Sequence, residues 1–251
     1  MNIGHQIRRY TRVSSTNDLA WNLAGDAAMN GVLFLTEEQI AGRGRRGDLW
    51  VAPPGSSLLL SILLHPPATL NRPVILTLWA TLGICQVLEH HLNLRPHLKW
   101  PNDIMIAGKK VCGVLVEQRQ GWCVVGIGLN VNFPDNWQSY SSLPNAAALS
   151  DFIRSTIDRE SLLQQLLIRW NSDYDRLAVA DFTAFNTHWQ NYSQLTGRFV
   201  ELEAAGKTFQ GHVHSMGHQG IDLKTNGALH HFVPESISRI TIMDSGQACP
   251  G

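Results

Sequence analysis

Apolar positions in the first hundred residues repeat with two different periods, which predict strands and helices in turn. Helix-capping residues from Ser14 to Asp18 precede apolar positions at helical spacing, and this first helix is expected to run on until Gly31 stops it. Residues 72–92 predict a longer helix, whose first turn can contain Pro73. Short apolar runs predict strands over residues 7–13, 32–36 and 57–64.

The middle of the chain has the pattern of a strand-rich block followed by two helices. Two apolar runs flank the pair Ala107-Gly108, which predicts a hairpin. Asp158 and Asp181 can each cap a helix, because apolar positions at helical spacing follow both. The strands predicted before these helices cover residues 97–100, 103–106, 111–117 and 122–132.

The pattern of apolar and turn residues changes again from about Gly197, where short strand-like runs are separated by glycine turns. The pair Asn226-Gly227 is a strong hairpin signal. A small all-β barrel or sandwich of roughly 50 residues is the simplest interpretation. We therefore predict a larger domain over residues 1–192 and a small β domain with its tail over residues 193–251. The strands predicted in the small domain cover residues 198–203, 208–214, 220–224 and 228–233.

Charge and cysteine content narrow the class of protein. The 20 basic and 20 acidic residues give a formal net charge of +0, which argues against a dedicated nucleic-acid-binding protein. The four cysteines form no C-x-x-C pair and have no zinc-ligand spacing, so no metal ligand is assigned. We interpret the first three as small hydrophobic residues and the last as part of the tail; they are Cys85, Cys112, Cys123 and Cys249.

Targeting and membrane-spanning segments are not expected. Residues 1–12 are polar and basic and lack the apolar region of a signal peptide. The longest apolar stretch, around Val74–Leu88, is interrupted by polar residues and is expected to be too short and too mixed to cross a bilayer. A reducing cytoplasm is the expected compartment, and no membrane partner is expected.

A loop of alternating glycine and arginine is the first segment that carries chemistry. It runs from Gly42 to Gly47, where three glycines allow close approach of the backbone to a ligand. Three arginines offer planar charged forks that match carboxylate and phosphate oxygens. The loop lacks the Gly-Lys-Ser/Thr ending of a P-loop, and by itself it could equally be a solvated surface loop.

Two further segments place polar groups and glycines on neighbouring strands. Lys99–Asp103 fixes a lysine, a rigid proline and an Asn/Asp pair in a small volume, before the turn that carries Lys109 and Lys110. Strand alternation predicts that one of these two lysines faces solvent and the other the working side of the sheet, although a charged hairpin tip is the simpler alternative. Gly126 and Gly128 share one face of a strand, which indicates that another group presses close there, although a bulge or a helix contact is the simpler alternative.

Taken together, these segments resemble the biotin–protein ligase family. The resemblance rests on the Gly42–Gly47 loop followed by Trp50 and Pro53, the Lys99–Asp103 box, and several further matches in the same order. It covers roughly residues 10–240, and several separated motifs in order are far more specific than any one of them. The further matches are Ser15-Thr16-Asn17, Lys110 with Gly113, and Gly126–Asn130.

The resemblance implies a shared site for biotin and an adenylate. It implies that Lys110 and Arg45 contact the biotin carboxylate and the phosphate during catalysis, and that Asp103 lies near the incoming acceptor lysine. It also implies that Trp50 helps to form the adenine side and Asn130 the nucleotide or metal side. The residues that it implies at or near the biotin head group, as hydrogen-bonding partners, are Ser15, Thr16, Asn17 and Gln39. Arg43 and Gly44 would lie with Arg45 over the biotin carboxylate and the phosphate, and the remaining ligand-binding residues that it implies are Gly113 and Gly128.

The same resemblance implies the fold and the reaction. The fold would be α+β, with a class II synthetase-like mixed sheet flanked by helices and then a small SH3-like all-β domain. The enzyme would be an ATP-dependent biotin–[acetyl-CoA-carboxylase] ligase that uses ATP and Mg²⁺ to convert biotin to biotinyl-5′-AMP. It would then transfer biotin to a lysine of a biotin carboxyl carrier protein, as a monomer or a homodimer.

The sequence departs from the family pattern at three positions, and three rival functions have to be distinguished from biotin ligation. Asp48 stands where a basic residue is expected, Cys112 at a small-residue position, and Ile40 in place of a polar residue. The rivals are a lipoate–protein ligase, a biotin-responsive transcriptional repressor and a catalytically inactive biotin-binding module. About a dozen residues precede the catalytic domain, so the helix-turn-helix domain of a repressor is not expected.

Overall fold

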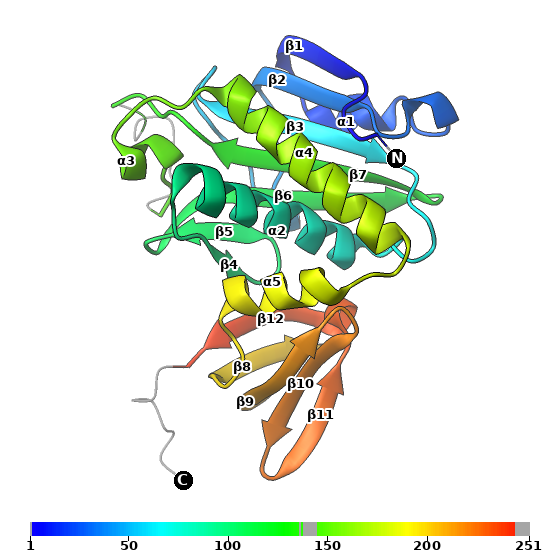
Figure 1. The fold of residues 1–251 in the computed structure, drawn as a ribbon, viewed down its shortest axis with the longest axis vertical. Coiled ribbons are helices and arrows are strands. Elements are labelled where there is room, and N and C mark those ends of the chain that lie inside the picture. The colour runs from blue at the N-terminus through cyan, green and yellow to red at the C-terminus, as the bar shows by residue number, and fades with distance from the viewer. Residues whose placement is uncertain (1, 136, 138–144, 244–251) are drawn as a thin grey trace.

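A mixed seven-stranded sheet forms the larger part of the protein in a computed structural model, which describes residues 2–135, 137 and 145–243. Its strand order is β1-β2-β3-β7-β6-β5-β4 (Figure 1). β1 and β2 are parallel, and the other neighbouring strands are antiparallel. The strands are β1 (Ile7–Val13), β2 (Leu33–Gln39), β3 (Ser57–Leu64), β4 (His97–Lys99), β5 (Asp103–Ile106), β6 (Lys109–Arg119) and β7 (Trp122–Asn130).

Two long helices cover one face of this sheet and enclose the main core (Figure 1). α2 (Pro73–Leu92) packs on β6 and on α4 (Arg159–Ala178), and Trp79 and Trp170 lie fully buried between the two helices. By length and composition alone, α2 is long and apolar enough to cross a membrane, so the expectation that the stretch around Val74–Leu88 is too short and too mixed was wrong. Its apolar stretch is 78% buried, as in the core helix of a folded domain.

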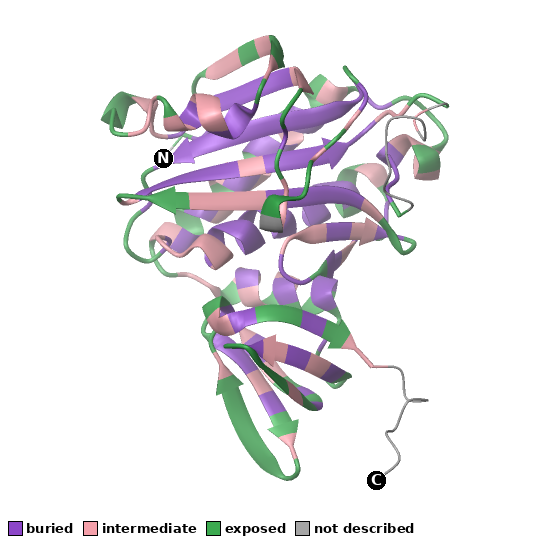
Figure 2. Ribbon diagram, turned by 180° about the vertical axis from the view of Figure 1, so that it is seen from behind, coloured by how far each residue is buried: buried purple, intermediate pink, exposed green. Residues whose placement is uncertain are grey.

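The opposite face of the sheet is covered only in part, by α1 (Thr16–Trp21) and by the chain that joins β2 to β3. Figure 2 views the molecule from this side, where strands rather than long helices face the reader. Strand register decides which residues point this way. Ser61 lies opposite Gly126, and Gly128 lies opposite Gly113. The small residues of three adjacent strands therefore form one shallow area on this face.

A second sheet, of five antiparallel strands, lies below the first (Figure 1). Its order is β11-β10-β9-β8-β12, and α5 lies between it and the large sheet. Trp100 stacks on Trp189 of α5 at 5.5 Å between ring centroids, and its Nε1 donates to the backbone oxygen of Ile237 at 3.3 Å. The elements are α5 (Thr183–Ser193), β8 (Phe199–Ala204), β9 (Lys207–Gly217), β10 (Gly220–Thr225), β11 (Ala228–Phe232) and β12 (Ile237–Ile242).

The α+β class and the small all-β sheet predicted from the sequence are confirmed, with local corrections. α1 ends at Trp21 and not near Gly31, because Gly25 turns the chain with a φ of +103°. Asp181 accepts from the amide of Thr183, but the residue that precedes the helix is Phe182. Two elements were missed, α3 (Leu149–Ile153) and β12. Cys249 and the tail from residue 244 lie outside the described residues.

Candidate active site

A cleft of about 1100 Å³ lies on the partly covered face of the large sheet. Its walls come from α1, the glycine-arginine loop, the Lys99–Asp103 segment and β12 of the small sheet, and its floor from β6 and β7. Segments far apart in the sequence thus meet at one place. The cleft is lined by all the ligand-binding and catalytic residues expected from the sequence, namely Ser15, Thr16, Asn17, Gln39, Arg43, Gly44, Arg45, Trp50, Asp103, Lys110, Gly113, Gly128 and Asn130.

Glycines make the floor of the cleft flat enough for other side chains to lie on it. The Trp50 indole rests against Gly128 and Gly113, and a methyl group added to Gly113 would lie 2.8 Å from the Trp50 ring. A methyl group on Gly128 would overlap the same ring, and one on Gly126 would overlap the Asn17 amide. Both floor glycines of β7 are therefore required by close approach: Trp50 of the chain before β3 approaches Gly128, whereas Gly126 makes the helix contact given as the alternative, with Asn17 of α1.

Lys110 is turned into the cleft by a β-bulge. β5 pairs Asp103 with Gly113 and Ile104 with Cys112, but Met105 with Lys110, so the register skips Val111. Without this extra residue Lys110 and Gly113 would point to opposite faces of β6; with it they share the cleft face. The two lysines of the turn therefore differ, because Lys109 is exposed and Lys110 is partly buried. The expected division between a solvent-facing and a site-facing lysine is thus found.

Lys110 and Asp103 form an ion pair inside the cleft. The Lys110 Nζ atom lies 2.6 Å from Asp103 Oδ1, and the two side chains are 31% and 24% exposed. The same ammonium lies 5.5 Å from the centre of the Trp50 ring. The fixed charge is therefore held at one position above the floor, where it could meet an anionic ligand. The structure gives the Asp103 carboxylate a partner within the chain, whereas its role toward an acceptor lysine stays a prediction.

The glycine-arginine loop is tied to both sides of the cleft. Arg43 donates to both oxygens of Asp18 on α1, at 2.6 and 3.0 Å, and this guanidinium lowers the pKa of the Asp18 carboxyl. On the other side Arg45 Nη1 donates to Asn102 Oδ1 at 3.4 Å. Asp48, unusual at its position, is exposed and accepts through its backbone oxygen from the amide of Gly44. The loop thus spans the cleft, with Arg43 anchored at one wall and Arg45 at the other.

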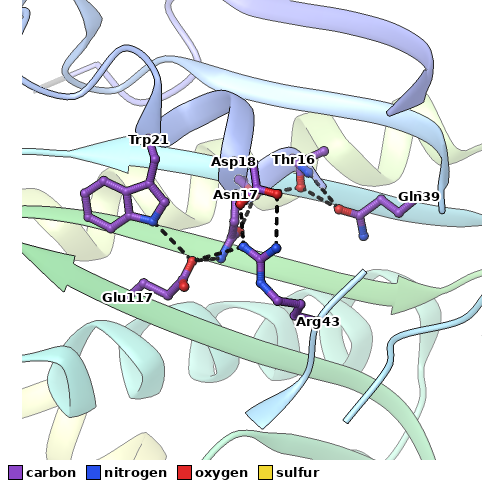
Figure 3. Close-up of polar contacts among 8 residues, drawn as sticks. Thr16, Asn17, Asp18, Trp21, Gln39, Arg43 and Glu117 are labelled. Atoms are coloured by element: carbon purple, nitrogen blue, oxygen red, sulfur yellow. Dashed lines mark hydrogen bonds and ion pairs between the residues drawn. The ribbon is translucent and has the colours of Figure 1, made fainter. Parts of the chain in front are cut away.

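Polar side chains of α1 form a connected network at one end of the cleft (Figure 3). The Thr16 amide donates to Gln39 Oε1 at 2.8 Å, and Ser61 Oγ lies 2.6 Å from both Thr16 Oγ1 and Asn17 Oδ1. Asn17 Nδ2 in turn donates to Glu117 Oε2 at 2.7 Å. All of these except Gln39 and Glu117 are less than 9% exposed. The network therefore fixes the orientation of side chains that would otherwise rotate.

The other departures from the family pattern do not disturb the floor. Cys112 is fully buried on the core side of β6, and burial raises the pKa of its thiol well above its ordinary value. Ile40 is 62% exposed and lies outside the lining of the cleft. Two groups were missed by sequence reasoning: Glu117, behind Asn17, and the residues of β12, of which Arg239 and Thr241 line the cleft.

Comparison with known proteins agrees with this geometry. Residues 10–133 match the model of the Biotin/lipoate A/B protein ligase family. The chain is 30% identical to a bifunctional ligase/repressor of Bacillus subtilis, over 87% of this chain and 69% of that one. It is 32% identical to a biotin–[acetyl-CoA-carboxylase] ligase of Mycobacterium tuberculosis, over 71% and 70% of the two chains.

Solved structures show the same fold. A biotin protein ligase from Aquifex aeolicus in complex with biotin and ATP superposes with a TM-score of 0.77 at 24% identity, over 95% of this chain and all of that one. Together with the curated relatives, this fold and its lysine-and-arginine cleft are those of an ATP-dependent ligase. The chain belongs to the biotin–protein ligase family.

Proposed function

We infer that this protein is a biotin–protein ligase, which activates biotin with ATP to biotinyl-5′-AMP and transfers biotin to a lysine of a carrier protein. The observation that carries this inference is the convergence of Lys110, Arg43 and Arg45 on one glycine-floored cleft in a member of this family. Similar biotin–[acetyl-CoA-carboxylase] ligases support a biotin carboxyl carrier protein as the partner.

The chemistry needs fixed positive charge where oxygens become more negative. In the first step the biotin carboxylate attacks the α-phosphorus of ATP and pyrophosphate leaves; in the second the acceptor amine attacks the anhydride carbonyl and AMP leaves. Lys110 can stabilise both transition states because Asp103 holds it in place, and Arg43 and Arg45 of the loop add positive charge beside the adenylate. Asp103 holds Lys110, and it can orient the acceptor amine during transfer.

A magnesium ion is the expected companion of ATP. The described residues contain no group of three or more His, Cys, Asp or Glu side chains that could hold a metal, so the phosphates of ATP would supply most of its ligands. Asn130 fits such a role, because its Oδ1 is buried beside the cleft without a hydrogen-bond partner, while its Nδ2 donates to the oxygen of Ala147. The ion would neutralise phosphate charge as pyrophosphate departs.

The remaining properties follow from the same proposal. We propose a cytoplasmic location, which suits three buried cysteines that are free thiols. We also propose that the protein does not bind nucleic acid, given its balanced charge. It could act as a monomer or a homodimer, and light scattering at working concentration distinguishes the two. A lipoate–protein ligase is the second candidate, because the matched family contains both kinds of enzyme.

Mass spectrometry of a carrier domain tests the proposed function directly. The protein is incubated with ATP, Mg²⁺, a biotin carboxyl carrier domain and either biotin or lipoate. We expect the mass of one biotinyl group to appear on the carrier domain, and only with biotin. A mass increase with lipoate alone would assign the chain to the other branch of the family, and no increase with either acid would remove the proposal.

Protease sensitivity of the glycine-arginine loop should depend on the adenylate. Three glycines make the loop costly to order, and three arginines converge better when an anion lies beneath them. We expect trypsin to cut after Arg43, Arg45 or Arg46 at least tenfold more slowly with biotin and ATP than without them. Lys110→Ala protein, which should not form adenylate, serves as the control and should be cut equally fast in both conditions. Equal rates for the unmodified protein would contradict ordering of the loop.

A further inference from the structure

Glu117 is a carboxylate of β6 at which three separate segments meet (Figure 3). Asn17 Nδ2 and Trp21 Nε1 of α1 both donate to its Oε2 atom, at 2.7 and 3.2 Å. Arg43 of the glycine-arginine loop places its Nη2 atom 3.9 Å from the same oxygen. Glu117 does not line the cleft, although Asn17 and Arg43 do. Any influence of Glu117 on a ligand must therefore pass through the side chains that it holds.

The orientation of the Asn17 amide is decided by this contact. A carboxylate accepts hydrogen bonds, so the group of Asn17 that faces Glu117 has to be its NH₂. Its Oδ1 atom then faces Ser61, whose hydroxyl donates to it at 2.6 Å. The amide lies against Gly126, where no Cβ could be accommodated, and Asn17 is only 5% exposed. The two ends of the amide are thus distinguished by a carboxylate on one side and a hydroxyl on the other.

The same carboxylate sets the direction of the hydrogen bonds beyond Asn17. Ser61 has one hydroxyl hydrogen, and Asn17 Oδ1 can only accept, so this hydrogen goes to Asn17. The hydroxyl of Thr16 donates to Gln39 Oε1 at 3.1 Å, and its oxygen lies 2.6 Å from the Ser61 oxygen. A chain of donors therefore runs from Ser61 through Asn17 to Glu117, and Thr16 lies in contact with its first member. Such chains strengthen each member by polarisation and rigidify the groups they contain.

We propose that Glu117 is a positioning residue of the biotin site, which acts by fixing the Asn17 amide and, through it, the hydroxyl of Ser61. The inference rests on the proposed function, because it takes biotin as the ligand that Thr16 and Asn17 meet. With Glu117 in place, Asn17 presents its remaining amide hydrogen to a ligand. Without it, the amide can turn over and present its oxygen instead, so a ligand would meet a mixture of arrangements.

A double-mutant cycle measured by calorimetry tests this role. Biotin binding is titrated without ATP, so that only the binding step is observed. We expect Glu117→Ala to weaken biotin binding about tenfold in the otherwise unmodified protein. In an Asn17→Ala background it should weaken binding less than twofold, because the hydrogen bond between Asn17 and Glu117 is then already absent. We expect the KM for ATP to change less than twofold. Gln118→Ala, at the next position of the strand, removes a contact to Asn71 outside the cleft and should leave biotin binding unchanged.

Two conservative variants separate position from charge. Glu117→Gln keeps an oxygen that can accept from Asn17 and should bind biotin within about threefold of the unmodified protein. Glu117→Asp keeps the charge near Arg43 but withdraws the acceptor by one methylene, so its biotin affinity should fall at least threefold. The same variant replaces Glu117→Ala in the experiment if Glu117→Ala fails to fold. The inference would be overturned if Glu117→Ala lost the same factor in biotin affinity with and without Asn17, or lost none. Failure of the unmodified protein to bind biotin would instead overturn the proposed function.

Discussion

Lys110→Ala is expected to lower the rate of biotin-dependent pyrophosphate release about a hundredfold or more, with the fold retained. Lys110 is the ammonium that the β-bulge turns into the cleft, where Asp103 holds it at 2.6 Å. Loss of one preorganised donor to a developing oxyanion typically costs two to three orders of magnitude in rate. Pyrophosphate release measured with a coupled phosphate assay gives this rate directly.

Lys109→Ala is the matched control for this prediction. Lys109 is adjacent on the same strand, but its side chain is exposed and lies outside the cleft. This variant should release pyrophosphate at the normal rate, and circular dichroism should show the same helix content for both variants. Near-normal pyrophosphate release by a folded Lys110→Ala protein would exclude Lys110 from the activation step.

Arg45→Gly is expected to uncouple activation of biotin from its transfer. Arg45 connects the loop to Asn102 across the cleft, so its loss frees one side of the loop and adds a further glycine. A charge-assisted contact is worth about 1.5–3 kcal/mol, so the adenylate should leave roughly tenfold to a hundredfold faster. Lys110 remains in place and should still support adenylate formation. Labelling of a bystander such as serum albumin, measured with ATP and biotin present, should therefore increase.

Two variants make this result interpretable. Arg45→Lys keeps a charge but lacks the planar fork, so it should label the bystander less than Arg45→Gly does. Arg45→Gly combined with Lys110→Ala should label nothing, because no adenylate forms. Bystander labelling at the normal level by an Arg45→Gly protein that makes adenylate would show that another group retains the intermediate. Absence of adenylate would place Arg45 in the first step together with Lys110.

Regular periodicity explains which elements could be predicted from the sequence. β3 and β5 have the predicted bounds because each is a short apolar run with clear ends. α2 begins only one residue later than predicted, at Pro73, because its long apolar stretch also has clear ends. β12 was missed because a register shift between Ile237 and Arg239 breaks its alternation of buried and exposed residues. α3 has five residues, too few to establish a helical period.

The candidate site also has features that a local stretch of sequence predicts and features that depend on residues far apart in the sequence. Gly126 and Gly128 indicated close approach because glycine is unfavourable within a strand. The groups that approach them are Asn17 and Trp50, which lie more than seventy residues away in the sequence. Likewise Glu117 contacts Asn17 at a separation of 100 residues, and its position on β6 carries no local signal. Pairing across such distances depends on strand register, and a single bulge changes which side chains share a face.

The position of β12 has a consequence for the way in which the protein is made on the ribosome. Its residues lie at positions 237–242, yet Arg239 and Thr241 form part of the wall of a cleft whose lining residues outside β12, apart from Leu195, are made by residue 146. Synthesis proceeds from the N-terminus, so the large sheet can begin to fold while this last wall is still inside the exit tunnel. A nascent chain thus has its charged loop and lysine long before it has an enclosed cleft. A reactive anhydride formed at that stage would be poorly sheltered from water, and full enclosure of the cleft has to wait for the synthesis of β12.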